Sequence, residues 1–352
     1  MSKKRILFFA VMALVLAALV YLQVRAWRRF DWETFGDQTA NVNWLLICGS
    51  VFFVYAADTV RAWRWALLLR PSKKVSGASL IAPQFIGFAG LALLGRPGEL
   101  IRPYIIGRRV GLPLSSQMAV WTVERIFDFG TVTLFLLLDI LFSSSLRELP
   151  VYHAVRTGGF LLGGLVLLGI ATAILLGSFG APISNRIERT FSPRFPEFAG
   201  RLCLRIREFS NGLNSIQDAR SFVYCTLMSI MVWGGVALSY RLVTFAYRDP
   251  QVSQLDIPQV ILLMFGSIAG GVLQLPVIGG GSQFATISIM QNVFDITPEL
   301  ATSCGIMLWL VTFMSVTPVG LLLARRERIS LTQLAAAEEE ASLHNPSAAV
   351  AE

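Results

Sequence analysis

Two short charged segments in an otherwise apolar chain hold the residues whose types and spacing could do chemistry. They are Arg96, Glu99 and Arg102 in GRPGELIRPY, and Glu124, Arg125 and Asp128 in VERIFD. Guanidinium groups bind phosphate through two parallel hydrogen bonds, and carboxylates orient guanidinium groups or bind cations. We therefore predict that these residues bind a phosphate-bearing or cationic group of a substrate.

Further charges lie inside apolar segments, where an ionised side chain costs about 3 kcal/mol even on lenient insertion scales. Asp58, Arg61 and Arg64 are spaced three apart in YAADTVRAWRW and share one face of a helix. Arg241 lies in the apolar segment SYRLVTF. We expect Asp58, Arg61 and Arg241 to be ion-pair partners of the two charged segments. For Arg64 we expect a position at the level of the lipid headgroups, which its long side chain can reach.

A later glycine-rich segment, LPVIGGGSQ, extends the predicted site. Gly279, Gly280 and Gly281 would let backbone amides approach a phosphate closely, and the positive ends of helix dipoles would add to the attraction. Gln283 follows as a polar side chain in the same segment. The same glycines also suit a tight bend between two short helices, and both interpretations stay open.

The composition indicates the surroundings of these charges. The chain has 352 residues, of which 54% are hydrophobic and 15% charged, and its mean hydropathy is +0.61. Apolar windows of about 18 residues or more recur along the whole length, each long enough to cross the hydrocarbon layer. The sequence therefore predicts an all-α polytopic membrane protein, and no soluble domain fits between the windows.

The net charge and the scarcity of metal-ligating residues limit the partners. We assign the formal net charge of +8 to cytoplasmic loops that meet anionic lipid headgroups, and we do not expect nucleic-acid binding. Two histidines and four widely separated cysteines indicate no metal site, disulfide framework or histidine-based catalytic triad. We therefore expect neither a metal nor a cofactor.

The distribution of basic residues predicts the path of the chain through the membrane. If every apolar run crossed, the basic segments 96–109 and 179–220 would lie on opposite sides, against the positive-inside tendency. We therefore expect 78–107 to form a re-entrant hairpin from the cytoplasm and 258–296 to form one from outside. Six full spans are then predicted, with both termini in the cytoplasm: 5–23, 44–69, 117–142, 155–178, 221–245 and 299–323.

This path has the layout of an inverted-topology repeat, in which two broken helices meet near the middle of the membrane and frame a site. Each half contains two full spans with a hairpin between them. We expect one membrane domain over residues 1–328, in which 179–220 is an amphipathic cytoplasmic loop, and a disordered tail over 329–352. Gly159 and Gly163, four residues apart, predict a close helix contact.

Several of these segments resemble a known family. GRPGELIRPY resembles the G-x-GE-x-x-R element, and VERIFD the E-R-x-x-D element, of the flippase-like membrane family that includes the N-terminal half of the lysylphosphatidylglycerol synthase/flippase proteins. RAWRWALLL and LPVIGGGSQFATI resemble two further stretches, so that the resemblance covers about residues 40–325. The polar residues that match the family are Glu99, Arg102, Glu124, Arg125 and Asp128.

The resemblance implies an inner-membrane protein that moves or handles lipid-linked molecules. Two departures limit what carries over. The family usually has a glutamate where this sequence has Gln283. This position therefore lacks the acidic group that binding a proton or a cation would need. The soluble aminoacyl-transferase domain has no counterpart in this sequence, so we do not expect lysyl-lipid synthesis by this chain alone.

We therefore predict a lipid translocase of a bacterial-type cytoplasmic membrane. Its substrate would be a phospholipid or a polyprenyl-phosphate-linked lipid, a separate synthase would supply that lipid, and a homo-oligomer stays open. The arginines of the two charged segments would hold the phosphate, and the carboxylates would orient them. One alternative is a membrane-embedded transferase with Glu99 or Glu124 as general base, and another is an accessory subunit whose polar residues only hold helices together.

Overall fold

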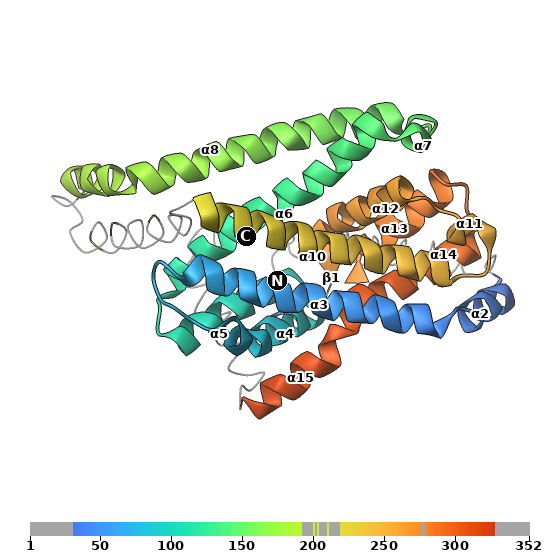
Figure 1. Cartoon of the computed structure of the whole chain (residues 1–352), viewed down its shortest axis with the longest axis horizontal. Helices are drawn as coiled ribbons and strands as arrows, with labels where there is room; N and C mark the ends of the chain where they lie inside the picture. The colour runs from blue at the N-terminus through green and yellow to red at the C-terminus, as the bar shows by residue number, and fades with distance from the viewer. Residues whose placement is uncertain are drawn as a thin grey trace, which may run out of the picture.

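The computed structural model describes residues 31–191, 219–275 and 279–327, together with the isolated residues 200, 203 and 210. Within these ranges the protein is helical apart from connecting turns and two strands of two residues each. Most of the long helices run roughly along the long axis of the molecule (Figure 1). The predicted span 5–23, the tail 329–352 and most of the predicted amphipathic loop lie outside the described residues.

The first half of the protein consists of a long helix, a helical hairpin and a second long helix. Its elements are α3 (Trp44–Leu69), α4 (Gly77–Leu94), the 3-10 helix η1 (Arg96–Leu100), α5 (Ile101–Val110) and α6 (Leu114–Phe142). Gly95 ends α4 with φ 72°, a conformation that glycine adopts readily and other residues avoid. The chain then turns back, and α5 packs closely against α4 because Gly87 has no side chain to displace Arg102.

Both ends of this hairpin lie at the same end of the molecule. The Lys73 ammonium, just before α4, donates to the Val110 carbonyl at the end of α5 over 2.6 Å. The Arg109 guanidinium pairs with Glu327 over 2.6 Å, which brings the end of α15 (Val316–Arg326) to the same place. We call this the basic end, because it carries Arg70, Lys73, Lys74, Arg108, Arg109, Arg325 and Arg326.

The second half repeats this order of elements. It contains α10 (Ala219–Ala246), α12 (Ile257–Gly270), the 3-10 helix η2 (Gly271–Leu273), β1 (Gln274–Leu275), β2 (Gly279–Gly280), α13 (Gly281–Asn292), α14 (Pro298–Trp309), the π-helix η3 (Leu310–Met314) and α15. Gly280, with φ 72°, begins the return helix α13 as Gly95 begins η1. β1 and β2 pair antiparallel at the tip of this hairpin, a ladder that the sequence did not predict.

The two halves run in opposite directions. α3 and α10 pack antiparallel: Ser50 Oγ lies 2.7 Å from Ser239 Oγ, and Arg64 Nη1, further along α3, lies 2.6 Å from Ser229 Oγ, earlier in α10. The α4–α5 hairpin lies toward the basic end, and the α12–α13 hairpin lies toward the opposite end (Figure 1). This is the spatial arrangement that an inverted repeat requires.

The remaining described elements are α2 (Trp32–Ala40), α7 (Ser144–Arg147), α8 (Tyr152–Phe191) and α11 (Pro250–Ser253). α8 packs on α6, where Gly159 lies beside Ile140 and Gly163 beside Leu137, in agreement with the spacing of the two glycines. α8 has 40 residues and is therefore about 60 Å long. It continues to Phe191, so its last residues cover the start of the predicted amphipathic segment 179–220.

Five helices in the described ranges are long and apolar enough to cross a membrane. They are Trp44–Leu69, Gly77–Leu94, Tyr152–Thr172, Ala219–Ala246 and Pro298–Arg326. Gly77–Leu94 has this length although α5 folds back along it. The predicted span 117–142 lies in α6, which is not among the five because it carries Glu124, Arg125, Asp128 and Asp139. The protein is an all-α membrane protein with several spans, and the number six stays a prediction.

Close backbone contacts within both hairpins lead to a stability prediction. A methyl group added at Gly98 would overlap the carbonyl oxygen of Gly90, and one added at Gly270 would overlap that of Gly281. Overpacking of this kind costs about 1–3 kcal/mol, so we expect Gly98→Ala to lower the thermal unfolding midpoint in detergent. Gly234→Ala is the matched control, because no atom lies within 4 Å of the methyl group added there. Its midpoint should stay or rise, and equal midpoints for the two variants would contradict this account of the hairpin.

Candidate functional site

Glu124 of α6 lies at the centre of a buried ion cluster built by three helices. Its carboxylate accepts hydrogen bonds from Arg64 Nη2 of α3, over 2.9 Å, and from Arg102 Nη2 of α5. The side chains of Glu124 and Arg64 are fully buried, and that of Arg102 is 6% exposed. One carboxylate therefore ties α3 and the first hairpin to α6.

Asp128, one turn further along α6, completes the cluster. It accepts from Arg64 Nη2 over 2.7 Å and from the indole Nε1 of Trp233 on α10 over 3.0 Å. Arg125 Nη2 lies 3.0 Å from the other carboxylate oxygen of Asp128. Arg64 also donates to Ser229 Oγ over 2.6 Å, so the cluster joins the first half of the protein to the second.

Arg102 has uncharged partners in addition to Glu124. Its Nη1 donates to Gln84 Oε1 of α4 over 3.0 Å, and its guanidinium carbon lies 4.4 Å from the centre of the Trp65 ring. The Trp65 indole N–H donates to Gln117 Oε1 over 3.2 Å and so fixes the ring. This arrangement suits a buried guanidinium group, because the face of an aromatic ring attracts a cation without a further counter-charge.

The cluster is stable only as a unit. Each ion loses several kcal/mol of hydration when it is buried, so a member without its partner would be strongly destabilising. Glu124 and Asp128 balance the charges of Arg64 and Arg102, all four of which are buried. Arg125 supplies one further positive charge, and its side chain is 28% exposed. The excess charge therefore lies at the accessible edge of the cluster.

A cavity of about 170 Å³ lies between the two halves of the protein. Its charged lining consists of Asp58 and Arg61 from α3, Glu99 from η1 and Arg125 from α6. The second half contributes, among others, Trp233, Tyr240, Met264, Ser267, Gly271 and Thr312. Glu99 lies at the tip of the first hairpin and Gly271 at the tip of the second, so both hairpins border the same space.

Arg61 lies between two aromatic rings at the wall of this cavity. Its guanidinium carbon is 5.1 Å from the ring centre of Phe88 and 5.2 Å from that of Trp233. Arg61 Nη1 lies 3.7 Å from Asp58 Oδ1, which is too far for a hydrogen bond. The Nε atoms of Arg61 and Arg125 are buried and have no hydrogen-bond partner in the described part of the chain. Both arginines on the cavity wall thus have a buried donor without a partner among the described residues.

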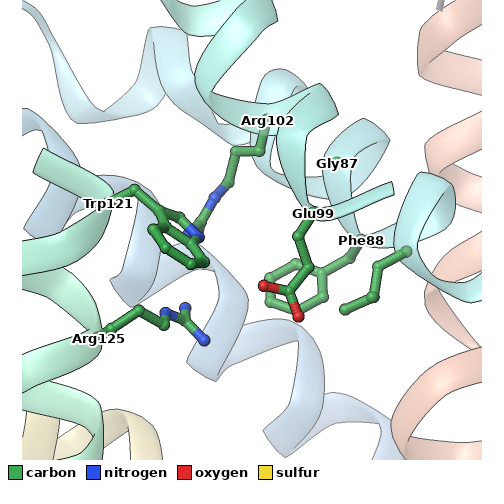
Figure 2. A pocket seen from close by; sticks show the side chains of 7 residues that line it. Gly87, Phe88, Glu99, Arg102, Trp121 and Arg125 are labelled. Carbon is green, nitrogen blue, oxygen red and sulfur yellow. The ribbon is translucent and has the colours of Figure 1, made fainter. Parts of the chain in front are cut away.

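A smaller pocket shares Phe88, Leu91, Glu99 and Arg125 with this cavity. Figure 2 shows the carboxylate of Glu99 and the guanidinium group of Arg125 directed toward each other across the pocket, with the Trp121 ring beside them. The pocket lies between the tip of the first hairpin and α6. A carboxylate and a guanidinium group on opposite walls can bind a ligand that carries both an acceptor and a donor.

The structure brings most of the predicted site residues together. Glu99, Arg125, Asp58 and Arg61 line the cavity, Arg102 lines the smaller pocket, and Glu124 and Asp128 lie in the cluster behind them. Arg96 is described only through its backbone, at the start of η1. The ion cluster therefore lies next to the cavity and holds in place the side chains that face it.

Other predicted residues lie elsewhere. Gly279 is in β2, Gly280 and Gly281 begin α13, and Gln283 is in the first turn of that helix. Neither Gly280, Gly281 nor Gln283 belongs to the described lining of the cavity. Arg241 has a different partner from the one expected: it donates to the Ser253 carbonyl of α11 over 3.1 Å, because the exposed end of that one-turn helix offers a free carbonyl.

The sequence analysis missed or misplaced several residues of the cluster. Arg64 was expected at the headgroup level, but its side chain is fully buried because both carboxylates of α6 need a cation at that depth. Gln84, a single amide in the apolar helix α4, was a usable signal for a buried polar partner. Trp65 and Trp233 gave no signal, since a tryptophan in an apolar helix is ordinary whether or not its N–H has a buried acceptor.

A bundle of apolar helices with inverted halves, a buried ion cluster and a cavity between the halves defines a multi-pass membrane protein with an internal polar site. The family described as lysylphosphatidylglycerol synthase TM region matches residues 7–320, and the chain belongs to this family. Membership indicates a membrane protein that acts in lipid modification or transport. Comparisons with curated proteins and with solved structures find no match.

The cluster predicts different effects for two charge-removing substitutions. Glu124→Gln leaves the buried Arg64 and Arg102 without their shared carboxylate, and breaking a buried pair costs about 3–5 kcal/mol. Glu327→Gln breaks the exposed pair with Arg109, which contributes about 0–1 kcal/mol. We expect the thermal midpoint in detergent to fall strongly for the first variant and hardly at all for the second. A Glu124→Gln protein with the stability of the wild type would refute a structural role for the cluster.

Proposed function

We propose that this protein is a lipid translocase that binds a phosphate-bearing headgroup in the cavity between its halves. The acyl or polyprenyl tails stay in the bilayer while the headgroup passes from one side to the other. Movement of the two hairpins would open the cavity alternately toward each end of the molecule.

The observation that carries this proposal is the state of the two arginines on the cavity wall. Arg61 and Arg125 line the cavity, and the Nε of each is buried without a hydrogen-bond partner among the described residues. A buried unpaired donor is costly, and the guanidinium groups that carry these donors face the cavity, where phosphate oxygens would accept charge-assisted hydrogen bonds from them. Arg102 is less suited to this role, because its Nη atoms already donate to Glu124 and Gln84.

The size and position of the cavity support a headgroup as the ligand. Its volume of about 170 Å³ is below the roughly 300–1,000 Å³ of sites that enclose a drug-sized molecule. A whole lipid does not fit, but a headgroup does, so the tails would stay outside the cavity. Glu99 and Asp58 would orient the arginines or bind a cationic part of the headgroup.

The charge distribution supports an orientation in the cytoplasmic membrane. The basic end carries arginines and lysines from three separate segments, and basic residues near the ends of spans are retained in the cytoplasm. With this end inside, the first hairpin opens from the cytoplasm and the second from outside. The lipid would be a phospholipid or a polyprenyl-phosphate-linked lipid, made by a separate enzyme.

Exchange of labelled lipid in reconstituted vesicles tests this function. Arg125→Gln removes a cavity donor and the excess positive charge, and loss of a hydrogen bond to a charged group costs about 1.5–3 kcal/mol. We expect the rate at which a headgroup-labelled phospholipid changes leaflet to fall about tenfold or more. Arg109→Gln is the matched control, since Arg109 lies at the exposed basic end, and it should keep the wild-type rate.

Three outcomes would reject or redirect the proposal. An undiminished rate in the Arg125→Gln protein would reject the role of the cavity. Exchange no faster with the wild-type protein than in empty vesicles would reject translocation itself. A covalently changed lipid after incubation would indicate a membrane-embedded transferase instead.

A further inference from the structure

Asp58 differs from the other buried carboxylates of the protein. Its side chain is 6% exposed, yet its closest charged partner is Arg61 at 3.7 Å, and it accepts no hydrogen bond from the described residues. Glu124 and Asp128, by contrast, are each held by two or three cations at hydrogen-bonding distances. The negative charge of Asp58 therefore depends chiefly on one loosely placed guanidinium group.

That guanidinium group is free to change partners. Arg61 is supported by the faces of Phe88 and Trp233 and makes no hydrogen bond within the described part of the chain. A phosphate entering the cavity offers Arg61 two oxygens in the geometry that a guanidinium group prefers. Binding would draw Arg61 away from Asp58 and leave that carboxylate without its counter-charge.

Other charged groups near Asp58 do not replace Arg61. Those that face it are Tyr55 on the same helix, Arg102 of α5, Glu124 and Arg125 of α6, Glu99 of η1 and Tyr240 of α10. Arg102 is committed to Glu124, and Arg125 lies within reach of Glu124, Asp128 and the incoming phosphate. The carboxylates among these neighbours repel a second negative charge. An isolated carboxylate in such surroundings is more stable in its protonated form.

We propose that Asp58 couples the binding of a phosphate headgroup to the uptake of one proton. An O–H bond forms on the Asp58 carboxylate, the proton comes from a hydronium ion or buffer acid in the cavity water, and no group is oxidised or reduced. The anionic headgroup and the proton then occupy the cavity together without a change in its net charge. This inference rests on the proposed function, and it makes a proton gradient the energy source for moving the lipid.

Proton counting during ligand binding tests this inference on the full chain in detergent. The probe is dihexanoyl phosphatidylglycerol, whose phosphodiester has no proton to exchange in the neutral range. Calorimetric titrations in two buffers of different ionisation enthalpy give the number of protons taken up. We expect close to one for the wild type, with affinity rising about tenfold for each unit fall in pH where uptake is complete.

Two variants distinguish coupling from a structural role. Asp58→Asn keeps the shape but cannot take up a proton, and it leaves Arg61 without competition. We expect this variant to bind the probe at least as tightly as the wild type, with no proton uptake and no pH dependence. Asp139→Asn is the matched control, since Asp139 is a partly buried carboxylate of α6 outside the cavity lining, and it should retain the wild-type proton count.

The outcomes separate this inference from the proposed function. Wild-type binding without proton uptake would overturn the coupling and leave the translocase proposal standing, and this result is decisive even if Asp58→Asn fails to fold. Equal proton uptake by the wild type and Asp58→Asn would also overturn it. No binding of the probe at any pH would count against both the coupling and the phosphate site.

Discussion

The pairing of buried charge is the constraint on which the rest of this structure depends. Glu124 is fully buried, so its charge must be paired with guanidinium groups from α3 and α5. Those groups cannot move away without leaving a buried carboxylate unpaired, which is strongly destabilising. This requirement holds the first hairpin against α6 and sets where its tip ends. Because Asp128 also reaches Trp233, and Arg64 also reaches Ser229, the same cluster sets the spacing between the two halves. The cavity is the space that this spacing leaves open.

The two halves share a backbone plan but differ in chemistry. Each contains a hairpin whose legs approach through a glycine pair and whose return leg begins at a glycine with positive φ. All the charged residues of the cavity wall come from the first half, whereas the second half contributes aromatic rings and hydroxyl groups. A ligand would thus be attracted by one half and enclosed by the other. The symmetry of the fold therefore does not extend to the binding groups.

The sequence was sufficient to predict an all-α membrane protein with several spans, because that class depends on the length and recurrence of apolar segments. The hairpins were predicted because the basic segments 96–109 and 179–220 would otherwise lie on opposite sides of the membrane. Glu99, Arg125, Asp58 and Arg61 were selected because charge inside an apolar segment is costly. Arg64 shows where this reasoning stops. Its long side chain, five residues before the end of α3, could extend to the headgroups or turn inward, and only the position of α6 decides between them. The partners Trp233 and Ser229 come from distant segments whose register with α3 no local pattern reveals.

α8 has no counterpart in either half, and its length has a consequence for the whole design. α6 finishes at one end of the bundle, and α10 begins at the other. Each half consists of a long helix, a hairpin and a second long helix, so the chain enters and leaves it at the same end of the bundle. Two such halves joined directly, or through two further crossings of the bundle, would therefore have the same orientation. The single helix α8 returns the chain to the other end of the bundle, so the second half runs antiparallel to the first. This single connecting helix, rather than any feature inside the two halves, is what places the two hairpins at opposite ends of one cavity.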